Sequence, residues 1–128
     1  MSKANPRVLY IEDNADNRLL VQRVLEAEGF TVVLAADGRS GLQAALAETP
    51  DVILMDINLP EVDGYTMTAR LKATPGLEHV RIIALTANVM KGDREKTLAA
   101  GCDGYIQKPI DVDALPRQIL RFLPHSHS

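Results

Sequence analysis

The chain has 128 residues, the size of one domain, and its 46% hydrophobic content with only 4% aromatic residues predicts an aliphatic core. The net charge of −3 argues against direct binding of nucleic acid, which needs clustered Lys and Arg. A single cysteine, Cys102, excludes an internal disulfide and fits a reducing compartment. No apolar run approaches the ~18 residues of a membrane span, and the first residues lack the apolar core of a signal peptide. We therefore expect a cytoplasmic protein without a membrane partner.

Short apolar runs alternate with helical patterns along the whole chain. The runs predict strands at Arg7–Ile11, Thr31–Ala35, Asp51–Met55, Val80–Leu85 and Gly104–Gln107. Such alternation predicts an α/β fold, a doubly wound five-stranded parallel sheet flanked by five helices with right-handed crossovers.

The first two expected helices are bounded by recognisable caps and breakers. Asn14 or Asp16 can cap the first helix, which ends before Gly29 in the position that favours a left-handed residue. A shorter second helix ends at Thr49-Pro50. The apolar positions at helical spacing are Leu20, Val21, Val24 and Leu25 in the first helix and Leu42, Ala45 and Leu46 in the second.

The third helix is expected from about 65 to 73, before the breaker Pro75-Gly76. The fourth is expected from about 94 to 100, with Asp93 as its cap and Gly101 as its stop.

The last helix is expected to bury Leu115, Ile119, Phe122 and Leu123. Both Asp111 and Asp113 can cap it, and Asp113 is preferred because Pro116 is tolerated only in a first helical turn. We expect residues 1–124 to form the domain and the polar tail 125–128 to be disordered.

Charged and polar side chains stand where four of the five expected strands end. These residues are Glu12, Asp13, Asp56, Thr86 and Lys108. The carboxyl ends of parallel strands lie at one edge of the sheet, where open α/β folds bind ligands. The sequence therefore predicts one crevice holding three carboxylates, a hydroxyl and an ammonium group.

Three neighbouring carboxylates repel each other unless a cation compensates their charge. Mg²⁺ suits such a site, because it takes oxygen ligands, one or two carboxylates and phosphate oxygens. Asp13 and Asp56 are the expected direct ligands, with the backbone carbonyl of Asn58 as the third, and Glu12 is expected to act through a water molecule.

The same residue types suit phosphoryl transfer, which needs mainly positioning and charge stabilisation. An Asp carboxylate such as that of Asp56 can be the nucleophile and form an acyl phosphate. The ammonium group of Lys108 and the hydroxyl of Thr86 can hold the phosphoryl oxygens. The small side chain of Ala87 leaves room for a donor group.

Four motifs that span nearly the whole chain make it resemble the response-regulator receiver domains of the CheY-like superfamily. They are IEDN at 11–14, MDINLPEVDG at 55–64, LTAN at 85–88 and GYIQKPI at 104–110. The resemblance implies a flavodoxin-like fold with strand order 2-1-3-4-5. It also implies that Asp56 is the phosphoacceptor, Glu12 and Asp13 the acidic pair, Thr86 the switch hydroxyl and Lys108 the family's lysine.

The resemblance extends to the switching mechanism. It implies that Tyr105 is a rotameric aromatic switch and that the bond between Lys108 and Pro109 is cis. The chain is similar to the receivers of hybrid histidine kinases and of single-domain cell-cycle regulators. The implied partners are a histidine kinase or histidine phosphotransfer protein and a downstream protein target, reached by the face of the fourth helix, fifth strand and fifth helix. The expected protein is a stoichiometric phosphoacceptor, monomeric or weakly dimeric, and not a turnover enzyme.

Two alternative functions use a similar fold. An aspartyl-phosphate hydrolase of the haloacid-dehalogenase type would need an Asp-x-Asp motif, but Asn58 stands in place of the second acid after Asp56. An FMN carrier of the flavodoxin type would need Ser, Thr and Gly after the first strand. This chain has Glu12, Asp13 and Asn14 there, which repel a phosphate in the absence of a cation.

Overall fold

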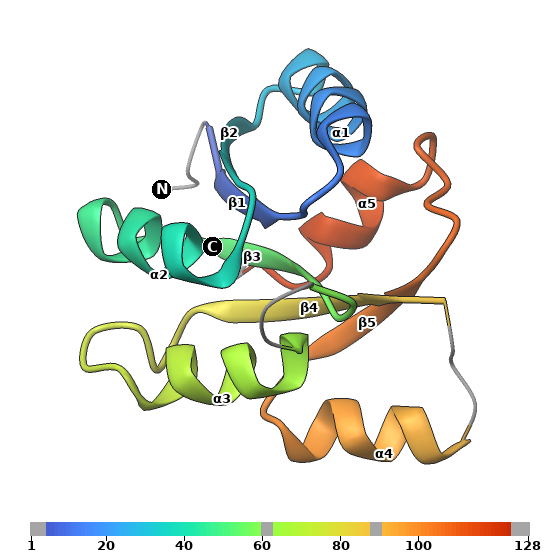
Figure 1. Cartoon of the computed structure of the whole chain (residues 1–128). Helices are drawn as coiled ribbons and strands as arrows, with labels where there is room; N and C mark the ends of the chain where they lie inside the picture. The colour runs from blue at the N-terminus through green and yellow to red at the C-terminus, as the bar shows by residue number, and fades with distance from the viewer. Residues whose placement is uncertain (1–4, 60–62, 88–90, 124–128) are drawn as a thin grey trace.

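The protein is a five-stranded parallel sheet covered by helices on both faces (Figure 1). The computed structural model describes residues 5–59, 63–87 and 91–123, so the predicted disorder of the tail 125–128 lies outside the described residues. The strand order is β2-β1-β3-β4-β5, as the resemblance implies. The strands are β1 (Arg7–Ile11), β2 (Thr31–Ala35), β3 (Val52–Asp56), β4 (Arg81–Thr86) and β5 (Gly104–Gln107).

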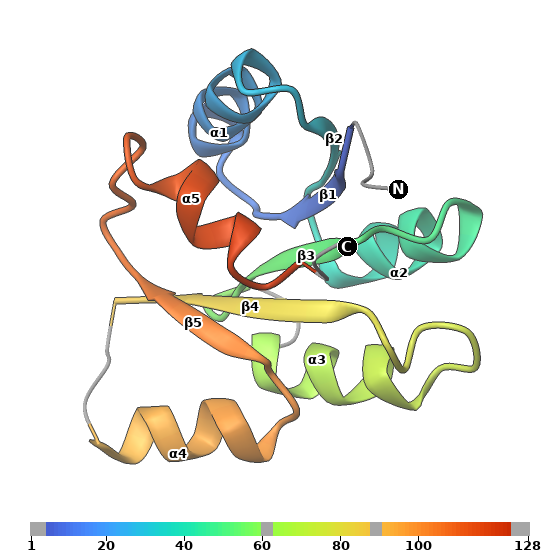
Figure 2. The same ribbon diagram turned by 180° about the vertical axis from the view of Figure 1, so that it is seen from behind.

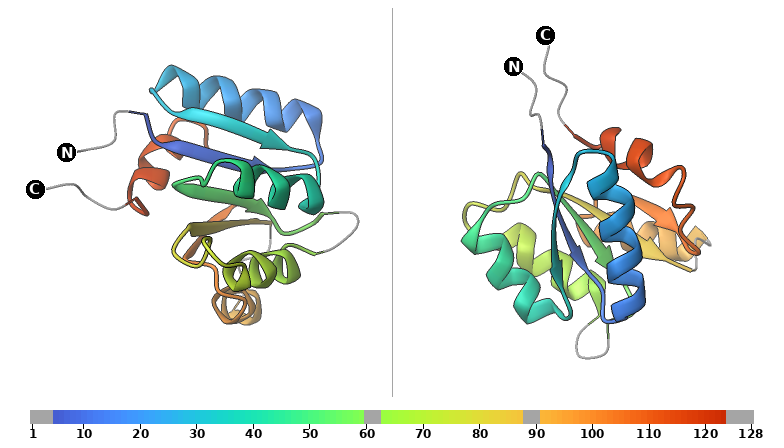
Figure 3. Two further views of the ribbon diagram at one scale, coloured as in Figure 1. Left: turned by 90° about the vertical axis from the view of Figure 1, so that its left-hand side faces the viewer. Right: turned by 90° about the horizontal axis from the view of Figure 1, so that it is seen from above.

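The helices divide between the two faces of the sheet. They are α1 (Ala15–Ala27), α2 (Gly38–Ala47), α3 (Gly64–Ala73), α4 (Lys91–Ala99) and α5 (Leu115–Leu120). Helices α1 and α5 cover one face, and α2, α3 and α4 lie on the other (Figures 1 and 2). The strands run side by side in one direction, so their carboxyl ends meet at one edge (Figure 3). No helix among the described residues is both long and apolar enough to cross a membrane.

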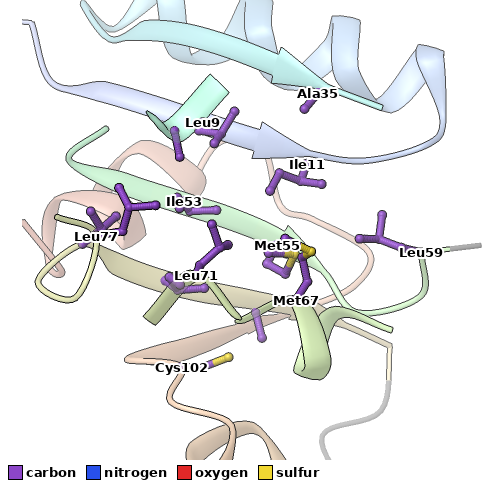
Figure 4. Close-up of a cluster of buried hydrophobic side chains, with 14 of the residues drawn as sticks. Leu9, Ile11, Ala35, Ile53, Met55, Leu59, Met67, Leu71, Leu77 and Cys102 are labelled. Carbon is purple, nitrogen blue, oxygen red and sulfur yellow. The ribbon is translucent and has the colours of Figure 1, made fainter. Parts of the chain in front are cut away.

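Strand β3 lies at the centre and is buried on both faces, which explains its continuous apolar sequence. Side chains alternate along a strand. Ile53 and Met55 therefore join the cluster beneath α2 and α3 (Figure 4), whereas Val52 and Leu54 join the cluster beneath α1 and α5. This central strand holds the buried carboxylate Asp56 as its last residue.

Several predicted caps are confirmed. Asn14 caps α1, because its side chain accepts a hydrogen bond from the backbone N–H of Asn17 at 2.8 Å. Gly29 follows α1 with a φ of 92°, the left-handed conformation that glycine adopts readily. These caps set the length of α1 between β1 and β2.

The prediction that Asp113 caps the last helix is wrong. The N-cap of α5 is Ala114, which makes no side-chain capping hydrogen bond. Asp111 organises the entry instead, since its carbonyl accepts the N–H groups of Ala114 and Leu115 and its carboxylate accepts the N–H of Asp113. A tight turn thus satisfies the backbone donors that a capping side chain would otherwise have taken.

Three smaller predictions also need correction. Helix α4 begins at Lys91, so Asp93 lies inside the helix and is not its cap. Leu20 and Leu46 do not belong to the buried faces of α1 and α2, since they are 49% and 56% exposed. Helical spacing places both leucines at the edge of an apolar stripe, and only the packing of neighbouring elements decides how far the stripe is covered.

Candidate functional site

The site lies at the carboxyl edge of the sheet. Glu12 follows β1 and donates its N–H to the carbonyl of Ala35, the last residue of β2, at 2.9 Å. Lys108 follows β5 and donates its N–H to the carbonyl of Thr86, the last residue of β4, at 2.8 Å. These backbone bonds continue the strand pairing by one residue beyond each strand, and so they fix the starting points of the functional side chains.

An acidic cluster forms where the predicted carboxylates meet. Glu12, Asp13 and Asp56 each place one carboxylate oxygen within 4.8 Å of the others. Glu12 and Asp56 are each 2% exposed, whereas Asp13 is exposed. All the donors are hard oxygen atoms, the ligand type that Mg²⁺ prefers. The cluster therefore fits a hard divalent cation that enters from the side of Asp13.

Asp56 is held by two donors on one oxygen. The ammonium group of Lys108 lies 2.8 Å from Oδ1 of Asp56, and the backbone N–H of Asn58 donates to the same atom at 3.0 Å. A buried carboxylate needs such partners, because an unpaired buried charge is strongly unfavourable. These two contacts also orient Oδ1 of Asp56 toward Lys108.

Glu12 is held on both carboxylate oxygens. The hydroxyl of Tyr10 donates to Oε1 at 3.0 Å, and the backbone N–H of Asn14 donates to Oε2 at 3.1 Å. Nη1 of Arg18 donates to the main-chain carbonyl of Glu12 at 2.7 Å. Burial raises the pKa of Glu12, and the charge of Asp56 adds to this effect, whereas the Asn14 hydrogen bond lowers it.

Tyr10 and Arg18 are the contributors that sequence reasoning missed. Tyr10 stands two residues before Glu12, so strand periodicity places both side chains on one face, and this signal was present in the sequence. Burial, and then the charge of Glu12, raise the pKa of Tyr10 above its usual range, so the phenol stays a donor at neutral pH. No comparable short-range pattern points from Arg18 to a backbone carbonyl.

A pocket of about 430 Å³ opens beside the cluster. Its lining includes Tyr10, Glu12, Leu20, Ala87 and Lys108. The pocket reaches Ala87, whose small side chain was expected to leave room for a donor group. It also explains why Leu20 remains half-exposed on α1.

The two predicted switch residues lie on the α3 and α4 side of the sheet. Tyr105 pairs in register with Ala84 and packs against the same cluster as Ala84. Thr86 follows Ala84 by two residues along β4, so the pleat directs it to the same face, and it is 5% exposed. The bond between Lys108 and Pro109 is cis, as the resemblance implies.

Comparisons with known proteins agree with this geometry. The family model of the response regulator receiver domain matches residues 8–120. The polar-differentiation response regulator DivK of Brucella anthropi is 41% identical over 116 residues, which cover 91% of this chain and 94% of the relative. The chemotaxis protein CheY4 of Vibrio cholerae has a similar structure, with a TM-score of 0.89, 28% identity and coverage of 94% of this chain and 100% of that one.

A further similar structure is the receiver domain of a sensor histidine kinase from Pseudomonas aeruginosa. It has a TM-score of 0.84 and 39% identity, covers 93% of this chain and 98% of that one, and has a magnesium ion coordinated in its active site cleft. These matches support neither the haloacid-dehalogenase type of hydrolase nor the FMN carrier. The match over residues 8–120, together with the acidic cluster facing Lys108, shows that the chain belongs to the response regulator receiver domains of two-component signalling.

Proposed function

We propose that the protein is a phosphoacceptor and that Asp56 takes the phosphoryl group from a histidine kinase or a histidine phosphotransfer protein. The contact between the Asp56 carboxylate and the Lys108 ammonium group, 2.8 Å long and beside two further acids, carries this proposal. The pocket lined by Ala87 and Lys108 leaves room for the phosphohistidine beside the site.

In the transfer, a carboxylate oxygen of Asp56 attacks the phosphorus atom of phosphohistidine. The new O–P bond forms as the N–P bond breaks, and the bonding electron pair stays on the imidazole nitrogen. The ring leaves as neutral imidazole, because either its other nitrogen already carries a proton or the leaving nitrogen takes one from solvent. Lys108 stabilises the charge on the phosphoryl oxygens, and the hydroxyl of Thr86 and the backbone N–H of Ala87 contact them after transfer.

The acidic cluster holds Mg²⁺ in this proposal. Asp13 and Asp56 would bind it directly, the backbone carbonyl of Asn58 would be the third protein ligand, and Glu12 would act through a water molecule. When bound, the cation would supply positive charge next to the phosphoryl oxygens. The magnesium ion in the Pseudomonas aeruginosa receiver, at 39% identity, supports this assignment.

The output of this switch is a protein contact made by the face of α4, β5 and α5. The phosphoryl group draws in the hydroxyl of Thr86, and Tyr105 turns into the space that opens behind it. The protein acts stoichiometrically in the cytoplasm as a monomer or weak dimer, and its downstream target is another protein. Thr86 and Tyr105 lie on the same side of the sheet, which supports this route.

Incubation with acetyl phosphate and Mg²⁺ tests the assignment. Intact mass spectrometry is expected to show one added phosphoryl group on the wild type and none on Asp56→Asn, because the amide lacks the nucleophilic oxygen. Asp16→Asn is the matched control, since Asp16 is an exposed acid on α1 outside the cluster. Equal labelling of Asp56→Asn and the wild type would show that another residue is the acceptor.

A further inference from the structure

We propose that Tyr10 is a positioning residue of the metal site. Its hydroxyl holds the Glu12 carboxylate in the orientation that receives a metal-bound water molecule. The inference rests on the proposed role of the acidic cluster in binding Mg²⁺. Tyr10 lies outside the four motifs that carry the family resemblance, so the inference adds a new residue to the site.

The packing around Tyr10 fixes the position of its hydroxyl group. The side chain is fully buried, in the cluster that β1 shares with α1 and α5. An aromatic side chain has only two rotatable bonds, so close packing of the ring also fixes the oxygen at its tip. That oxygen lies 3.0 Å from Oε1 of Glu12, which is two residues further along on the same face of the sheet.

The Tyr10 hydrogen bond completes a set of contacts that define the carboxylate plane. Oε2 of Glu12 accepts the backbone N–H of Asn14, and the main chain of Glu12 is bound to Ala35 and Arg18. With Oε2 held, the carboxyl group can still pivot about that contact. The hydroxyl of Tyr10 on Oε1 removes this freedom and so fixes both oxygens.

Glu12 needs such a restraint because its surroundings favour rotation. Asp13 and Asp56 lie within 4.8 Å and repel its charge when no cation is bound. The pocket of about 430 Å³ borders Glu12 and offers the carboxylate space and water. A Glu12 carboxylate turned into the pocket would have to be brought back before Mg²⁺ binds, and this reorganisation would weaken the observed affinity.

Tyr10→Phe removes the hydroxyl and keeps the ring. Mg²⁺ titrations followed by amide NMR signals around the site are expected to show Kd raised about five- to tenfold, the effect of one lost hydrogen bond of ~1 kcal/mol. The phosphorylation rate at saturating Mg²⁺ is expected to stay within about twofold of the wild type, because Asp56 and Lys108 are unchanged. An unchanged or tighter Kd would overturn the proposal.

A double-mutant cycle shows whether Tyr10 acts through Glu12. Tyr10→Phe is expected to change Kd in the wild type but not in a Glu12→Gln background, since the carboxylate that it orients is then absent. Tyr65→Phe is the matched control, because it removes a hydroxyl on α3 that accepts a hydrogen bond from Thr97. An equal rise in Kd in both backgrounds would show that the effect is not transmitted by Glu12, which contradicts the proposal.

Two further measurements separate this inference from the proposed function. If Asp13→Asn weakens Mg²⁺ binding but Tyr10→Phe does not, only the role of Tyr10 fails. If neither variant changes Kd, the metal site itself is wrongly placed. Should Tyr10→Phe not fold, the ring Cζ signal of Tyr10 in the ¹³C-labelled wild type gives the answer: it is expected to shift on Mg²⁺ addition while that of Tyr65 stays, and an unmoved Tyr10 signal overturns the proposal.

Discussion

Glu12 and Asp13 are neighbours in the chain but occupy different surroundings. Glu12 is 2% exposed and is held by Tyr10 and Asn14, whereas Asp13 is exposed at the mouth of the acidic cluster. The difference fits the separate tasks proposed for them. In the proposed metal site, the exposed Asp13 is the direct ligand and the buried Glu12 acts through a water molecule.

Asp13→Asn is therefore expected to weaken Mg²⁺ binding by more than about tenfold, since the loss of a direct ligand costs at least as much as the loss of an outer partner. Phosphorylation by acetyl phosphate at limiting Mg²⁺ is expected to slow in proportion, and a chelator is expected to stop it in the wild type. The measurements are an NMR titration and a mass-spectrometric time course, with Asp16→Asn as the control. Undiminished phosphorylation in excess EDTA would rule out the metal role.

Strand β5 is short, yet it precedes Lys108 directly and contains Tyr105. Its start is fastened by Asp103, whose Oδ2 accepts the backbone N–H of Ile82 at 2.8 Å and the ammonium group of Lys72 at 3.0 Å. The ring of Phe122 packs against Gly104, the first residue of β5, where a side chain would otherwise lie. The placement of Lys108 thus depends on contacts from β4, from α3 and from Phe122, which follows α5.

Gly104→Ala tests this packing at the level of the element. An added Cβ would lie 2.3 Å from Cζ of Phe122, so the ring or the strand must shift. The free energy of unfolding is expected to fall by about 1–3 kcal/mol, the usual effect of overpacking. Urea denaturation measures it.

The matched control for Gly104→Ala is the double variant with Phe122→Leu. Leucine lacks the ring atoms that clash. Gly104→Ala is therefore expected to lower the free energy of unfolding by less in the Phe122→Leu background than in the wild type. Equal penalties in the two backgrounds would mean that Phe122 is not what excludes a side chain at position 104.

At the scale of the whole molecule, the site and the proposed output face are linked through β4 and β5. Thr86 ends β4 at the site, and its carbonyl accepts the N–H of Lys108. Tyr105 pairs with Ala84 on the neighbouring strand and faces the α3 and α4 side. Differential interactions of a few kcal/mol are enough to shift an equilibrium between two arrangements of such a unit.

Thr86→Ala is expected to leave phosphoryl uptake at Asp56 largely intact but to uncouple it from the face of α4, β5 and α5. The reason is that the hydroxyl is the group through which the phosphoryl oxygens reach β4 in this proposal. NMR spectra of the wild type and the variant, each with beryllofluoride as the phosphoryl mimic, measure the coupling. If both show the same large shifts across residues 91–108, Thr86 is not the coupler.

Much of this molecule is determined by the sequence alone, because its signals are local. An apolar run such as Val52–Met55 has few options other than a buried central strand, and Gly29 and Asn14 mark the ends of α1 by their backbone preferences. With the strands placed, parallel topology brings their carboxyl ends together, so the meeting of Glu12, Asp56 and Lys108 follows from the sequence pattern.

The tertiary structure decided what depends on neighbours far along the chain. Leu20 fits the helical pattern of α1 but stays exposed, because the elements packed against α1 leave a pocket there. Asp113 has the right residue type for a cap, but the turn at Asp111 already satisfies the backbone donors. The hydrogen bond between Tyr10 and Glu12 depends on the pleat of β1 and on the packing of α1 and α5 over this face of the sheet. Local preference names the candidates in each case, and the packing of distant segments decides which contact is made.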